Sequence, residues 1–366
     1  MSGKLIMLPV AKGAHLETLS GIQNHDPRVY GRFEDPGVSR AVAYLLAHPS
    51  NNFMAHYLIE PICDRGRAIL AMNTRYLGND TMLLMERAIQ DLGAGMRFLR
   101  EQGFRKIVLI GNSGGASLAA LYQQQAEKLT ITDTPDGQPI ELRQQDLPSA
   151  DAVALLAAHC GRALTLTDSL DPAVLDEMDP GVTNPELDMY DECNPRPYDR
   201  QWLAHYRAAQ LARNERLTAR AQRMIAECPI GDAPFIVYRT KADPRTLDLT
   251  LDANDREPGA IWGDARLINQ SANGLARFCT ARSFLSQWSA RLSRAHGPRC
   301  LAATSVPVLN ASYSADQAAF PSNGAAWSEA AAGRCTEALI RNAPHYPQGN
   351  PAIVNQIADL LVQWGG

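Results

Sequence analysis

The sequence has 366 residues, of which 45% are hydrophobic and 20% are charged, and its formal net charge at pH 7 is −4. A chain of this length can bury a large core, either in one large domain or in a domain with an inserted segment. The mildly acidic balance argues against a nucleic acid or an anionic membrane surface as the main partner. No segment reaches the roughly 20 apolar residues that a membrane-spanning helix requires, so we expect no membrane partner.

The cysteines favour a reducing compartment. They are odd in number, scattered and without a C-x-x-C pair: Cys63, Cys160, Cys193, Cys228, Cys279, Cys300 and Cys335. Such a set is typical of free thiols and not of a disulfide framework or a zinc site. The N-terminal stretch MSGKLIMLPVAKGAHLE has an apolar part too short for the core of a signal peptide. We therefore predict a cytoplasmic protein with no metal.

The first third of the sequence alternates between strand-like and helix-like segments. Continuous apolar runs of strand length occupy residues 41–47, 68–72, 107–110 and 153–158. Apolar residues then recur at steps of four and three at Met85, Ile89, Leu92, Met96 and Leu99. This period predicts a helix that begins at Asp80 and ends at Gly103, and a second helix is predicted over 116–127. Runs that are apolar on both faces, separated by helices, indicate a parallel sheet covered on both sides.

The pattern lapses over about 161–299 and then resumes. In that middle region we predict one long helix, over 200–227, and a short strand over 235–238. The later elements are strands at 306–309 and 337–340 and helices at 325–332 and 352–364. The sequence thus predicts a core domain made of 1–160 and 300–366, with a largely helical cap inserted at 161–299.

A serine stands between glycines where a predicted strand meets a predicted helix. Residues 111–115 read GNSGG, which fits the pattern G-x-S-x-G. A serine that attacks a carbonyl must stand on a tight turn, and glycine two positions away on each side avoids collisions with the strand and helix. The alternative is a glycine-rich turn that only reverses the chain or cradles phosphate. Because the segment lacks the phosphate-loop lysine and the G-x-G-x-x-G spacing, we favour Ser113 as a nucleophile.

A serine hydroxyl needs a base and an acid that orients the base. His345, in RNAPHYPQGNP, follows the last predicted strand, and Asp316, in NASYSADQAAF, follows the strand at 306–309. Both lie beyond carboxyl ends of strands, where open α/β sheets place their sites, and the order Ser-Asp-His suits this chemistry. The alternatives are a surface histidine and a turn or helix-cap aspartate. Asp243, in the presumed cap, is a rival acid.

An oxyanion hole requires two preorganised N–H donors. One should be the amide of Gly114, directly after the nucleophile. The other should come from the loop after the first apolar run, where Ser50 is our first choice and Asn51 our second, because Pro49 has no N–H. The alternative is that these loop residues only cap a turn.

These features together resemble the α/β-hydrolase superfamily over about 41–364. The resemblance rests on the order of the elements, the turn at 111–115, the His48-Pro49 loop, Asp316 and His345. Further segments are similar to a bacterial branch of unassigned α/β-fold hydrolases: NTRYLGND (73–80), LDPAVLDE (170–177), ELDMYDECN (186–194) and YRAAQLAR (206–213).

The resemblance implies a mostly parallel central sheet with helices on both faces and an inserted, largely helical cap. It also implies a serine hydrolase with Ser113, His345 and Asp316 as its triad and with no cofactor. The usual His-Gly of the oxyanion loop is His48-Pro49 here, which leaves the second donor open.

We expect hydrolysis of a carboxylic ester, lactone or thioester of a small to medium molecule through an acyl-enzyme. Acyl transfer, amide or C–C cleavage, and a binding protein without turnover remain as alternatives. Candidate substrate-binding residues are His48, Asn112, His159, Tyr76 and Trp288. Trp262 and Phe284 are further candidates for an apolar pocket wall. The acidic residues of 168–179 lack the spacing of a calcium loop and favour a solvated loop. The sequence leaves open whether the chain forms a homodimer.

Overall fold

A central sheet dominates the computed structural model, which describes residues 3–12, 20–228 and 231–366. The sheet has eight strands in the order β1-β2-β4-β3-β5-β6-β9-β10. The pairs β1·β2 and β2·β4 are antiparallel and all the others are parallel. The strands span Lys4–Pro9 (β1), Arg28–Glu34 (β2), Val42–His48 (β3), Ala68–Asn73 (β4), Lys106–Asn112 (β5), Ala152–Leu156 (β6), Val308–Tyr313 (β9) and Cys335–Ile340 (β10).

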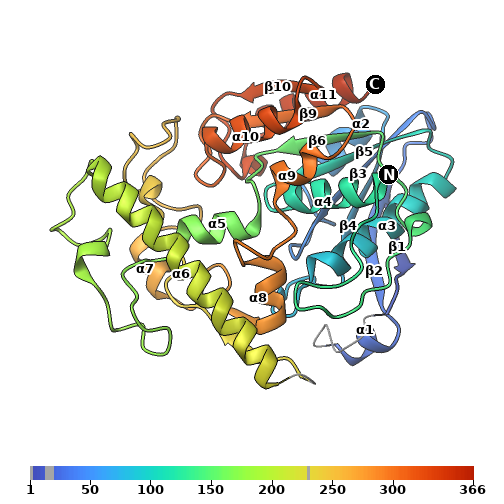
Figure 1. Ribbon diagram of the computed structural model, residues 1–366. Helices are drawn as coiled ribbons and strands as arrows, with labels where there is room; N and C mark the ends of the chain where they lie inside the picture. The colour runs from blue at the N-terminus through green and yellow to red at the C-terminus, as the bar shows by residue number, and fades with distance from the viewer. Residues whose placement is uncertain (1–2, 13–19, 229–230) are drawn as a thin grey trace.

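Helices cover both faces of this sheet (Figure 1). One face carries α3 (Met85–Glu101), α4 (Gly115–Glu127), α9 (Gly297–Ala302) and α10 (Pro321–Ala331), and the other carries α2 (Ile59–Asp64) and α11 (Pro351–Gly365). In β3, Leu45 packs with the first group, whereas Tyr44 and Leu46 pack with the second. Covering on both sides explains why the strands are continuous apolar runs, and the predicted mostly parallel α/β fold is confirmed.

The sequence did not predict β1 and β2. Side chains of β1 are mostly exposed, and buried and exposed residues are interspersed in β2. These antiparallel strands at one edge therefore lack the continuous apolar run that marks the buried parallel strands. A short helix, α1 (Gly21–His25), precedes β2.

Helix α3 begins later than predicted, at Met85 instead of after Asp80. The amide of Met85 donates to the hydroxyl of Ser286 (2.8 Å), and this hydroxyl donates to Glu86 (2.7 Å). The first backbone N–H of the helix therefore has its hydrogen-bond acceptor in a distant segment of the sequence. Asp80 instead pairs with Arg162. At the other end, Gly103 has a φ of +84° and follows the helix, as predicted.

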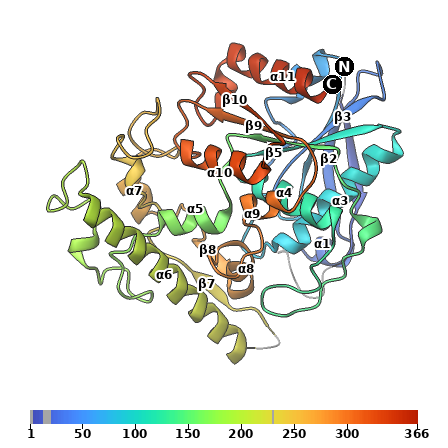
Figure 2. The same cartoon turned by 45° about the horizontal axis from the view of Figure 1, so that its top comes forward.

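A largely helical insertion lies between β6 and β9, on the left of Figures 1 and 2. It contains α5 (Arg162–Ser169), α6 (Arg200–Glu227), α7 (Ala265–Gln270), α8 (Ala281–Gln287) and the antiparallel pair β7 (Pro234–Ile236) and β8 (Phe278–Thr280). The predicted long helix matches α6, and the predicted strand at 235–238 overlaps β7. Short 3₁₀ helices occupy Gln144–Asp146, Pro185–Leu187, Pro244–Thr246 and Pro347–Gly349. Among the described residues, no helix combines the length and apolarity needed to cross a bilayer.

Arg213 ties α6 to the loops that it crosses. Its side chain is fully buried and donates to both carboxylate oxygens of Glu177 (2.8 Å each). It also donates to the backbone carbonyls of Asp171 (2.8 Å) and Tyr238 (2.9 Å). One guanidinium group thus forms hydrogen bonds with three segments of the insertion.

We predict that Arg213→Met destabilises the protein by about 3–5 kcal/mol, because it strands the Glu177 carboxylate and two carbonyls. Urea unfolding followed by circular dichroism measures this. Arg223→Met, on the exposed side of the same helix, is the matched control and should change stability by no more than about 0.5 kcal/mol. Equal effects of the two variants would contradict the role given to Arg213.

Candidate active site

The structure brings Ser113, His345 and Asp316 together at the carboxyl ends of the parallel strands. Ser113 follows β5, Asp316 follows β9 and His345 follows β10. Ser113 Oγ lies 2.9 Å from His345 Nε2, and His345 Nδ1 lies 2.9 Å from each carboxylate oxygen of Asp316. Three segments that are distant in sequence therefore form one continuous hydrogen-bonded chain.

The turn that carries Ser113 has no room for side chains on either side. Ser113 has a φ of +54°, which an L-residue rarely adopts. A Cβ on Gly111 would lie 2.6 Å from the Cα of Ala116, and a Cβ on Gly115 would lie 2.5 Å from the backbone oxygen of Ala47. Because both neighbours are backbone atoms, they cannot move aside cheaply. The glycines thus let α4 start directly against β3 and leave the serine hydroxyl free to face outward.

The Asp316 carboxylate is held in one orientation. It is fully buried, and its Oδ1 accepts hydrogen bonds from the amides of Ala318 (2.7 Å) and Ala319 (2.8 Å). A carboxylate facing Nδ1 can only accept, so the imidazole proton lies on Nδ1 of His345. The Nε2 of His345 is then the atom that accepts the proton of the serine hydroxyl.

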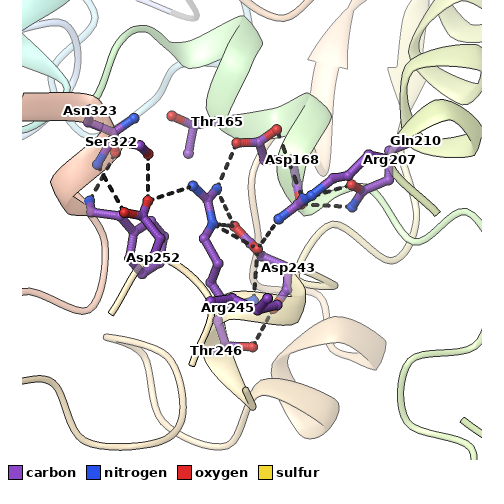
Figure 3. Close-up of polar contacts among 12 residues, drawn as sticks. Thr165, Asp168, Arg207, Gln210, Asp243, Arg245, Thr246, Asp252, Ser322 and Asn323 are labelled. Carbon is purple, nitrogen blue, oxygen red and sulfur yellow. Dashed lines mark hydrogen bonds and ion pairs between the residues drawn. The ribbon is translucent and has the colours of Figure 1, made fainter. Parts of the chain in front are cut away.

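Asp243, the rival acid, has other partners. It forms ion pairs with Arg245 (2.6 Å) and Arg207 (2.8 Å), as Figure 3 shows. Burial acts to raise the pKa of its carboxyl, but the two guanidinium groups outweigh burial and lower this pKa. The geometry therefore pairs His345 with Asp316 and not with Asp243.

The loop after β3 differs from the expectation for Ser50 and Asn51. Their amides donate to Nδ1 of His48, at 3.1 Å and 2.9 Å, so neither amide points at the serine. The His48 ring folds back over its own loop, which the sequence did not indicate. Since Nδ1 accepts two N–H groups, the ring proton lies on Nε2. A Cβ on Gly114 would lie only 2.7 Å from this Nε2, so the nitrogen sits beside the residue that follows the serine.

A cavity with a volume of about 260 Å³ opens onto Ser113. Of the predicted substrate-binding residues, His48, His159 and Trp288 line it, as do Ser50 and Asn51. Trp262, from the insertion, also lines it. Two residues do not: Asn112 bonds to His56 (3.0 Å) and to the backbone of Leu156 (2.9 Å), and Tyr76 is buried in the main core. Phe284, another candidate, is buried in the core of the insertion.

The sequence missed several cavity-lining residues from the insertion. The charged ones are Arg162, Asp168, Lys241 and Arg245. They come from α5 and from the segment around 241–245, which carry no recognisable motif spacing. Only the folded arrangement places them beside Ser113. Within the described residues, no group of three or more histidine, cysteine, aspartate or glutamate side chains is suited to hold a metal ion.

Three histidines near the site, His48, His56 and His159, have lowered pKa values. Burial lowers the pKa of His56 to about 4 and that of His159 to about 3, the latter also because the positive charges of Arg162 and Lys241 lie nearby. Burial and the nearby Arg162 hold the pKa of His48 well below its usual range. Burial disfavours the protonated, charged form of each ring.

Comparison with known proteins supports the fold. No protein-family model and no curated protein matches the sequence. Among solved structures, the esterase domain of a Rhodothermus marinus protein matches with a TM-score of 0.50 and 14% identity, covering 100% of this chain and 98% of that chain. A putative hydrolase from Agrobacterium vitis S4 matches with a TM-score of 0.50 and 11% identity, covering 100% of both chains. DcsB, in complex with its substrate analogue, matches with a TM-score of 0.54 and 10% identity, covering 100% of this chain and 98% of that chain.

Identities of 10–14% establish the fold and no more. Together with the observed strand order, they show that the chain has the α/β-hydrolase fold that the sequence resemblance implied. The closer resemblance to a bacterial branch stays a prediction.

We predict that the protein loses stability in mild acid. Each of the three rings has a lower pKa in the folded state than in the unfolded state. Below about pH 6.5 the unfolded state therefore binds more protons than the folded state. The free energy of unfolding should therefore fall from about pH 6.5 towards pH 4, by up to about 1.4 kcal/mol per pH unit for each of the three rings. Urea titrations between pH 7.5 and pH 4.5 measure this slope.

Two variants test the source of the slope. His56→Gln removes one titrating ring and keeps a group that can hydrogen-bond to Asn112, so its slope should be smaller by up to about 1.4 kcal/mol per pH unit. His205→Gln, at an exposed position of α6, should leave the slope unchanged. If the slope of His56→Gln equals that of the parent protein, this ring does not cause the acid sensitivity.

Proposed function

We propose that the protein is a serine hydrolase that cleaves a carboxylic ester, lactone or thioester of a small to medium molecule. One observation carries the proposal: the hydrogen-bonded chain Ser113–His345–Asp316 opens onto a cavity large enough for a ligand. Hydroxyl, imidazole and carboxylate in this order are what acyl transfer needs. Conformational strain at Ser113 further supports a functional role, since such strain is concentrated at active sites.

The proposed reaction has two halves. Ser113 Oγ attacks the carbonyl carbon while Nε2 of His345 takes the hydroxyl proton, and Asp316 stabilises the imidazolium. The tetrahedral intermediate collapses, the bond to the leaving group breaks, and the imidazolium returns the proton to the departing oxygen or sulfur. A water molecule then attacks the acyl-enzyme with His345 again as base. The products are the acid and free Ser113, and no cofactor takes part.

The oxyanion would be held by the amide of Gly114 and by Nε2–H of His48. The Gly114 amide follows the nucleophile at the start of α4, where helix geometry directs N–H groups towards the site. The proton on Nε2 of His48 is fixed by the two amides that bind Nδ1. A neutral, fixed N–H donor stabilises developing negative charge without a reorganisation cost. This assignment replaces Ser50 and Asn51 as second donors.

The insertion would serve as the cap of this site. Residues within 161–299 supply much of the cavity wall, including Arg162, Trp262 and Trp288. A cavity volume of about 260 Å³ favours a substrate of modest size. Acyl transfer to an alcohol or amine uses the same acyl-enzyme and remains the second candidate activity.

We predict that a fluorophosphonate probe labels Ser113 and that Ser113→Ala abolishes both labelling and ester hydrolysis. Loss of the nucleophile should reduce kcat by at least about 10⁴-fold. Mass spectrometry of the labelled peptide and a panel of chromogenic esters of rising chain length are the measurements. Ser149→Ala, at an exposed position, is the matched control and should be labelled like the parent protein.

An unlabelled parent protein would mean that the site binds without turning over. With added alcohol or hydroxylamine, a labelled protein could release more of the new ester or hydroxamate than of the acid. This result would favour the transferase activity. Acid as the main product under the same conditions supports hydrolysis.

We predict that His48→Leu lowers kcat by about 10²–10³-fold with a smaller change in KM, because the lost N–H acts chiefly on the transition state. His48→Gln keeps an acceptor and N–H donors on one side chain and should recover part of the activity. Thermal unfolding of both variants checks that the fold is intact. A kcat for His48→Leu within about threefold of the parent value would place the second oxyanion donor elsewhere.

A further inference from the structure

Charged side chains that line the cavity are almost all paired within the chain. Arg162 pairs with Asp80 and lies over the ring of Trp288, 4.3 Å from its centroid. Arg245 pairs with Asp243 (2.6 Å) and Asp168 (2.7 Å). Figure 3 shows that Arg207 joins this second group through its contacts with Asp243 and Asp168. The cavity walls thus hold cations and carboxylates that neutralise one another.

Lys241 is the exception. It is 92% buried, lines the same cavity, and its backbone is fixed by Asn269 (3.0 Å) and Tyr190 (2.5 Å). Within the described residues its ammonium group forms no hydrogen bond or ion pair. The ring of Trp262 lies against it, with its centroid 5.1 Å from Nζ. A cation–π contact is weaker than the cost of taking an ammonium group out of water. Burial lowers the pKa of Lys241; Asp243 attracts the ammonium group from beyond ion-pair distance but is outweighed by burial, and Arg245 opposes it, so the charge is not fully compensated.

Lys241 lines the same cavity as Ser113 and His159. Its charge is one of the causes that lower the pKa of His159, and a Cβ on Gly114 would lie 3.4 Å from Nε2 of that ring. The apolar side chains of Ile261, Trp262 and Leu275 line the same cavity, beside the paired charges of Asp243 and Arg245. A ligand seated at Ser113 therefore shares its cavity with the ammonium group.

We propose that Lys241 binds an anionic group of the substrate, so that the protein acts on esters with an apolar body and a carboxylate, sulfonate or phosphate away from the reacting carbonyl. This inference rests on the proposed function for the position of the scissile bond, but not for the binding of the anion. An ammonium group is a compact point charge and can accept any of these anions. The bound anion would supply the partner that the folded chain does not.

The kinetic test compares methyl esters that differ by one charge. The substrates are the monomethyl and dimethyl esters of straight-chain dicarboxylic acids from malonate to suberate, and methanol release gives kcat/KM. For at least one chain length we expect the half-ester to be at least about tenfold better than its diester. Lys241→Met should lower the ratio of half-ester to diester kcat/KM by at least about tenfold. Lys128→Met, at an exposed position after α4, should leave this ratio unchanged.

A binding test makes the result independent of turnover. Isothermal titration calorimetry with glutarate and its sulfonate and phosphonate analogues should show affinities at least about tenfold weaker in Lys241→Met than in the parent protein and in Lys128→Met. The analogue that binds most tightly identifies the anion. If Ser113 resists the fluorophosphonate probe but Lys241 still binds these anions, the proposed function fails and only the anion site of this inference stands.

Two results would overturn the inference. The first is a parent protein that is labelled at Ser113 and hydrolyses diesters but shows no half-ester preference at any chain length, together with equal anion binding in Lys241→Met and Lys128→Met. The other is a lower thermal midpoint for Lys241→Met, because it would show that the ammonium group already has a stabilising partner in the chain. Since the variant removes a charge that is not fully compensated, we expect its midpoint to be equal or higher.

Discussion

The site depends on a close approach between backbones. Helix α4 can begin against β3 only because Gly111 and Gly115 place no Cβ between strand, turn and helix. That approach forces the left-handed conformation of Ser113 and directs its hydroxyl to the carboxyl edge of the sheet. The loops after β9 and β10 reach the same edge with Asp316 and His345, which complete the hydrogen bonds to Ser113. Strain at one residue is thus sustained by packing that involves the whole centre of the sheet.

Electrostatics of the insertion explain how a polar cavity can form beside an apolar core. Arg213 with Glu177, and Arg245 with Asp243, bury charges that would be costly alone, and the more exposed Asp168 also pairs with Arg245. Arg213 of α6 pairs with Glu177, and Arg207 of α6 pairs with Asp243, so these contacts fix the loops of the insertion relative to α6. In this setting an unpaired ammonium group is informative, because the same chain neutralises the charges around it.

How much the sequence predicted follows from the range of the interactions concerned. The buried strands, α6 and the turn at 111–115 depend on local patterns, and the sequence located them. The start of α3 depends on Ser286, the fate of Ser50 and Asn51 depends on how the His48 ring folds, and Asn112 turns to His56. Contacts of this kind join residues by geometry and not by spacing, so no pattern reveals them. Lys241 was missed for the same reason, because nothing in its neighbourhood of the sequence marks it as a cavity residue.

The two imidazoles beside Ser113, those of His345 and His48, carry their proton on different nitrogens. At His345 a carboxylate facing Nδ1 keeps the proton there, so Nε2 is an acceptor. At His48 two amides facing Nδ1 require an acceptor there, so Nε2 is a donor. The partner of one ring nitrogen decides the chemistry of the other, and burial keeps His48 from gaining a second proton. The same side-chain type can therefore supply both a base and an oxyanion donor, provided that its surroundings fix the tautomer.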